Sequence, residues 1–73
     1  MDMTIWTIYD KPLDFPHGAV ARKFQLREGV SMPLQQAIYA GCIADLQVIM
    51  AAKGLHWIPR HSNDEAQIVG VWL

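Results

Sequence analysis

The apolar pattern is most distinctive in the last seven residues, QIVGVWL. The segment carries no charge, and its apolar side chains fall on both parities. Ile68 and Trp72 share one face, and the other face takes Val69, Val71 and Leu73. A strand covered on both faces shows this pattern, whereas a half-exposed strand alternates. We therefore predict that residues 67–73 form a strand inside a sheet, and that the rest of the chain covers it.

Two earlier segments are also predicted strands. Residues 4–9 (TIWTIY) are β-branched and aromatic, and they stop at a proline-containing turn. Since they too are apolar on both parities, we expect them to neighbour the C-terminal strand. Residues 19–28 (AVARKFQLRE) alternate, with Val20, Phe24 and Leu26 on one parity. This pattern predicts a strand with one wet face and its apolar parity turned to the core.

Between and after these strands lie turns. Residues 10–18 (DKPLDFPHG) contain two prolines and two aspartates, which favour an ordered loop over a helix. Residues 28–31 (EGVS) supply turn chemistry. Residues 60–66 (RHSNDEA) are the most polar part of the chain and are expected to form a solvated turn before the last strand.

Residues 33–53 allow two interpretations. One is a single long helix with Pro33 in its first turn. The other is a strand over residues 34–40, a break at Gly41, and a helix that ends at Lys53 and Gly54. A glycine inside a helix costs only about 1 kcal/mol relative to alanine, so the residues alone leave both interpretations open.

The predicted fold is α+β: a single domain over residues 1–73, with a small antiparallel sheet of about four strands and one helix packed on one face. The helix would span residues 43–53. The residues expected in the core are Trp6, Ile8, Phe24, Leu26, Ile38, Leu46, Ile49, Met50, Trp57, Val69 and Val71.

Composition points to self-association. Hydrophobic residues make up 52% of the 73 residues and charged residues 18%, and Cys42 is the only cysteine, so no internal disulfide can add stability. A protein this small has too little interior to bury all its apolar groups, and the simplest way to bury the remainder is to form a homodimer. The net charge of −1 disfavours nucleic acid as a partner. With neither a long apolar run nor a leader pattern, we expect a cytoplasmic protein and no membrane partner.

Candidate chemistry is sparse. The histidines lack metal-site spacing, and the hydrolase, P-loop and dinucleotide signatures are missing, so we predict no enzyme activity, metal or cofactor. One polar cluster remains, which could meet at one edge of the sheet. Its members are Tyr9, Asp10, Asp14, Arg22 and Arg60. Arginine suits carboxylate or phosphate, so the cluster could bind a ligand or partner, but an internal ion-pair network is the favoured interpretation.

The two ends of the chain resemble a family. The pattern WTIYDKPLDFP followed by Val20-Ala21-Arg22, and the ending in which Pro59-Arg60 precede IVGVWL, are similar to small uncharacterised proteins of tailed phages, prophages and their hosts. The resemblance implies a strand and then a helix in the middle segment, and so favours the second interpretation of residues 33–53. Gly70 departs from the pattern, which has an acidic residue there, so no role of that acid is carried over.

The leading functional prediction is a non-enzymatic protein-interaction module that self-associates as a phage or prophage accessory protein, with a host protein as a possible partner. The alternative is a small-ligand or nucleotide-binding protein that uses the Tyr/Asp/Arg cluster. A weak nucleic-acid binder that uses Arg22, Lys23 and Arg27 is the third.

Overall fold

The computed structural model describes residues 3–59 and 67–73. In this part of the chain it contains five strands and one helix. They are β1 (Met3–Asp10), β2 (Ala19–Arg27), β3 (Val30–Ala40), α1 (Ile43–Ala52), β4 (Trp57–Pro59) and β5 (Ile68–Trp72). The strands form one sheet in the order β3-β2-β1-β5-β4, and every neighbouring pair is antiparallel. The α+β prediction is confirmed, with β4 as a fifth, three-residue strand.

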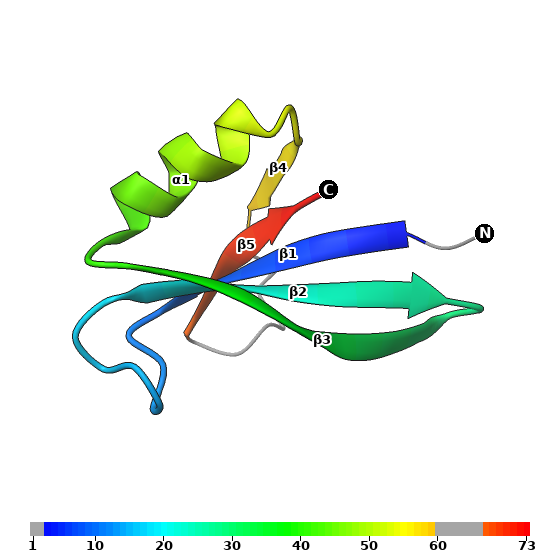
Figure 1. Cartoon of the computed structure of the whole chain (residues 1–73), viewed down its shortest axis with the longest axis horizontal. Helices are drawn as coiled ribbons and strands as arrows, with labels where there is room; N and C mark the ends of the chain where they lie inside the picture. The colour runs from blue at the N-terminus through cyan, green and yellow to red at the C-terminus, as the bar shows by residue number, and fades with distance from the viewer. Residues whose placement is uncertain (1–2, 60–66) are drawn as a thin grey trace.

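Helix α1 covers one side of the sheet, and the loop of residues 11–18 lies on the other side (Figure 1). The core between helix and sheet is built on Leu46 and Met50 from α1, both fully buried. These side chains pack over strand residues that include Trp6, Ile8, Ala19, Ala21 and Trp72. The two alanines allow the helix to approach β2 closely, because their side chains leave room for leucine and methionine.

The predicted core is only partly correct. Trp6, Ile8, Leu46 and Met50 are buried, and Ile38, Trp57 and Val69 pack against them. Phe24, Leu26 and Val71, however, lie on the side of the sheet away from the helix, and Ile49 is 37% exposed. Strand β2 does alternate as predicted, but the helix packs on the face of β2 that carries the small residues Ala19 and Ala21. The apolar parity of β2 therefore faces the other side.

Strand β5 lies between β1 and β4, so its predicted place inside the sheet, next to β1, is confirmed. The prediction that β5 is covered on both faces is wrong, because Trp72 is buried under the helix whereas Val71 on the opposite face is only half-buried. A register shift opposite Ile8 and Tyr9 also breaks simple alternation. It places Ile68 opposite Tyr9, while Val69 packs against the core.

The middle of the chain follows the strand-then-helix interpretation. Strand β3 begins at Val30, earlier than predicted, because Glu28 and Gly29 both have positive φ and close a two-residue hairpin between β2 and β3. Pro33 is tolerated inside β3 because β3 is an edge strand. Helix α1 ends at Ala52, and Gly54 follows with φ 77°.

Two tryptophans join the C-terminal strands to the helix layer. The ring centroids of Trp57 and Trp72 are 5.4 Å apart, and the indole N–H of Trp72 donates a 2.8 Å hydrogen bond to the Gln47 side-chain oxygen. Gly70 lies beneath the Trp57 ring, and a Cβ added there would be 2.5 Å from the Ile58 carbonyl oxygen. A side chain at position 70 could not occupy this space, so the packing here requires glycine.

Across residues 3–59 and 67–73, no helix has both the length and the apolar character needed to cross a bilayer.

Candidate functional site

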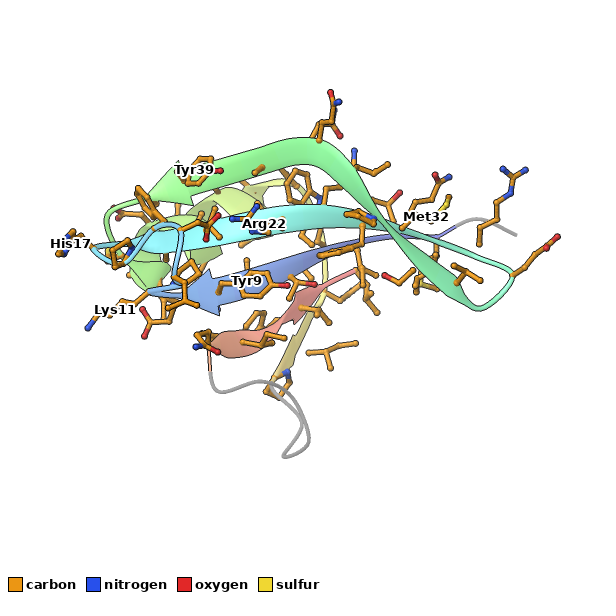
Figure 2. The ribbon with its side chains drawn as sticks, turned by 90° about the horizontal axis from the view of Figure 1, so that it is seen from below. Tyr9, Lys11, His17, Arg22, Met32 and Tyr39 are labelled. Atoms are coloured by element: carbon orange, nitrogen blue, oxygen red, sulfur yellow. The ribbon has the colours of Figure 1, made fainter. Side chains whose placement is uncertain are left out.

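The structure brings together three members of the predicted polar cluster. Arg22 of β2 lies opposite Thr7 of β1, and its guanidinium group donates to the Asp14 carboxylate in the loop. The same guanidinium carbon is 6.0 Å from the centre of the Tyr9 ring. Figure 2 shows Tyr9 and Arg22 on adjacent strands, on the side of the sheet away from the helix.

This geometry favours an internal ion pair over a ligand site. The Arg22 side chain is 32% exposed and the Asp14 side chain 60%, so solvent screens the pair, and its contribution to stability is about 0.2–1 kcal/mol. Its two partners hold the arginine head in one place, one by charge and one by its ring face. The pair therefore ties the loop of residues 11–18 to β2.

One predicted cluster residue, Asp10, is not part of this arrangement. Asp10 pairs with Ala19, and alternation along β1 places its side chain on the opposite side of the sheet from Tyr9. Its backbone N–H donates a 2.7 Å hydrogen bond to the Gln67 carbonyl oxygen. Arg60 lies outside the described residues. Sequence proximity to Tyr9 misplaced Asp10, because neighbouring strand residues point to opposite faces.

Aromatic packing also holds the loop, through a partner ring that the sequence pattern did not specify. Phe15 makes an edge contact with Tyr39 of β3, with ring centroids 5.1 Å apart. A Cβ at Gly18 would collide with the Phe15 ring and lie 2.5 Å from the Ala40 carbonyl oxygen. The Lys11 N–H donates a 2.8 Å hydrogen bond to the Gly18 carbonyl oxygen and closes the loop. The feature of the sequence that indicates this anchor is the aromatic residue Phe15, which lies between Pro12 and Pro16.

The basic residues of β2 do not form one surface. Arg22 faces the side away from the helix, whereas Lys23 pairs with Trp6 and its ammonium nitrogen is 5.5 Å from the Trp6 ring centre. The ammonium nitrogen of Lys53 is 5.7 Å from the same ring. The nucleic-acid hypothesis uses Arg22, Lys23 and Arg27 together, and alternation places Arg22 and Lys23 on different faces of the sheet.

The largest feature outside this cluster is the side of the sheet away from α1, which we call the open face. Seven apolar side chains from four strands are partly or well exposed there. They are Met3, Ile5, Phe24, Leu26, Ile58, Ile68 and Val71. Among the described strand residues of this face, Arg22 is the one charged side chain, and Asp14 neutralises it. The open face is thus apolar and without net charge.

Within residues 3–59 and 67–73, the surface has no detectable pocket, and no three histidine, cysteine, aspartate or glutamate residues are grouped to hold a metal ion. Cys42, at the start of α1, is exposed. The candidate sites in the described part of the chain are therefore the ion-paired loop and the open face.

No family model matches this chain, and no curated protein or solved structure is significantly similar to it. The physical properties of its surface therefore carry the functional argument.

Proposed function

We propose that this chain is a non-enzymatic protein-interaction module that self-associates. The observation that carries the proposal is the amount of uncharged apolar surface. The open face exposes apolar side chains on four strands, and further large apolar side chains are exposed on β3: Val30, Met32, Leu34 and Tyr39. Exposed apolar patches of this extent mark protein-contact sites.

The dimensions of the molecule support a protein partner. Its principal extents are 35 × 26 × 25 Å, so the open face approaches the area that one partner contributes to a standard interface, about 800 Å². A small molecule binds best in a concave site that encloses most of its surface. The open face, on which the described residues form no pocket, instead suits another protein surface.

The cluster of Tyr9, Asp14 and Arg22 has a structural role in this proposal. It anchors the loop at one end of the open face, and no other described segment covers the rest of that face. The phage or prophage setting implied by the two chain ends, and a cytoplasmic location, form part of the same proposal.

The test is sedimentation equilibrium from low micromolar to near-millimolar protein, combined with dilution calorimetry at several temperatures. We expect reversible association with a negative heat-capacity change, the marker of apolar burial. Val48→Lys is the control, because Val48 is 71% exposed on α1, away from the sheet, and its replacement should leave association unchanged. A protein that stays monomeric at every concentration would refute the proposal.

A further inference from the structure

Strand β3 leaves one edge of the sheet bare. It is the longest strand, 11 residues from Val30 to Ala40, and it lies at the end of the strand order. In the described part of the chain, no other strand lies beyond it. In an antiparallel edge strand, alternate residues direct their N–H and C=O groups away from the sheet. β3 therefore offers a row of donors and acceptors to another backbone.

Two devices that protect edges in natural sheets are weak in β3. Charged side chains, lysine above all, discourage edge pairing, but the β3 sequence VSMPLQQAIYA contains no charge. A proline and a bulge also discourage edge pairing, but in β3 both fall in the first two-thirds of the strand. The proline is Pro33, and the bulge lies between Pro33 and Ala37, which pair with Phe24 and Arg22 of β2. Residues 37–40 have neither, and they pair regularly with β2.

The opposite edge of the sheet is protected. Strand β4 has only three residues, Trp57–Pro59, and the last is a proline, which has no N–H to donate. Because one edge is bare and the other is blunted, the sheet can be extended on one side only. Joining β3 to β4 of another copy, which would build an open fibre, is disfavoured, whereas joining like edges closes the assembly at two copies.

We propose that two copies of this chain pair antiparallel along residues 37–40 of β3, around a two-fold axis, to form one continuous sheet. This proposal rests on the self-association proposed above and places its contact at the β3 edge, so the two open faces are joined side by side and are not buried against each other. Both helices then lie on one side of the joined sheet, and the two open faces merge on the other. Tyr39, 54% exposed and supported by Phe15, lies at the junction, where it packs against a side chain of the other copy.

Alternation restricts the position of the axis. Directly opposed residues of an antiparallel pair share a face, so a residue opposes either itself or one an even number of positions away. Within residues 37–40, the most central axes pass at Ile38 or at Tyr39. The first places Ile38 opposite its own copy and Tyr39 opposite Ala37. The second places Tyr39 opposite its own copy and Ile38 opposite Ala40.

Cysteine cross-linking tests this geometry. In a Cys42→Ser background, Ile38→Cys and Tyr39→Cys are oxidised under mild conditions at a protein concentration where the chain is dimeric. Two cysteines that oppose each other across an antiparallel pair lie within disulfide reach, so we expect one of the two variants to form an interchain disulfide in high yield. Ile58→Cys on β4, 45% exposed at the opposite edge, is the control and should remain reduced.

A second measurement does not depend on cysteine. Tyr39→Lys places a charge on the bare edge, and we expect it to raise the dimer dissociation constant about tenfold or more, whereas Val48→Lys should leave it unchanged. Backbone amides of residues 37–40 that point outward should gain protection from hydrogen exchange in the dimer and lose it on dilution. Exchange also shows whether Tyr39→Lys keeps the monomer folded.

The outcomes separate the two proposals. A dimer that cross-links through Ile58→Cys, or that tolerates Tyr39→Lys, would overturn edge pairing and leave self-association standing. A wild-type chain that is monomeric at all concentrations would overturn both. A β3 edge protected only after an extended peptide from another protein is added would also overturn the second-copy assignment.

Discussion

The closest contact among the C-terminal strands gives the sharpest test of the packing. In Gly70→Ala, the new methyl group would meet the Trp57 ring and lie 2.5 Å from the Ile58 carbonyl oxygen. Real Cβ contacts are not this short, so atoms must move. The carbonyl belongs to the backbone of β4, which is hydrogen-bonded to β5, and it cannot shift without disturbing that pairing.

The expected cost of Gly70→Ala follows from these contacts. Overpacking a close-packed site costs about 1–3 kcal/mol, and a backbone obstacle places this variant at the upper end. For a domain of this size, each kcal/mol lowers the melting temperature by about 4–8 °C. We therefore expect a Tm lower by at least about 8 °C, and a urea midpoint lower with an unchanged slope.

Gly41→Ala is the matched control. It makes the same chemical change at a glycine with nothing within 4 Å of the new methyl group and with no positive φ. We expect it to leave stability unchanged or to raise it by up to about 1 kcal/mol, because alanine restricts the unfolded chain. Equal stabilities for the Gly41 and Gly70 variants, measured by urea unfolding at one protein concentration, would refute the packing of Trp57 over β5.

Three further changes test the core and the loop. Leu46→Ala removes a fully buried side chain of α1, and we expect a loss of about 2–5 kcal/mol in chemical denaturation; a loss below 1 kcal/mol would contradict its central place. Gln47→Leu leaves the indole N–H of Trp72 without its acceptor, which should cost about 1–3 kcal/mol and shift the tryptophan fluorescence. Asp14→Asn removes the solvent-screened ion pair with Arg22, and we expect the free energy of unfolding to fall by less than about 1 kcal/mol, an effect that disappears in high salt. A large, salt-independent fall would contradict the conclusion that solvent screens the pair.

The candidate site was only partly predictable from the residues. The sequence analysis placed Asp14 and Arg22 in one polar cluster, and the structure pairs these two residues. The place of Asp10 was mispredicted because chain proximity was taken for spatial proximity. The contact of Phe15 with Tyr39 joins positions 24 residues apart, and a local pattern carries no information on such a pair.

The open face shows the same limit. The sequence indicated that β2 alternates, yet its apolar parity could not reveal which side the helix would cover. The helix packs on Ala19 and Ala21, because close approach of a helix to a sheet depends on small side chains there. The larger side chains of the same strand, Phe24 and Leu26, were therefore left on the uncovered face.

The sequence by itself determined the local structure of this protein: strands from β-branched runs, a turn that includes Glu28 and Gly29, a helix that stops before Gly54, and a last strand inside the sheet. These features depend on propensity and turn chemistry, which act over a few residues. Tertiary structure alone decided which face of the sheet the helix covers and that β3 forms the bare edge. It also decided that, after the register shift between β1 and β5, Val69 packs against the core and Ile68 lies opposite Tyr9. Those outcomes depend on how distant side chains fill shared space, and no short segment contains that information.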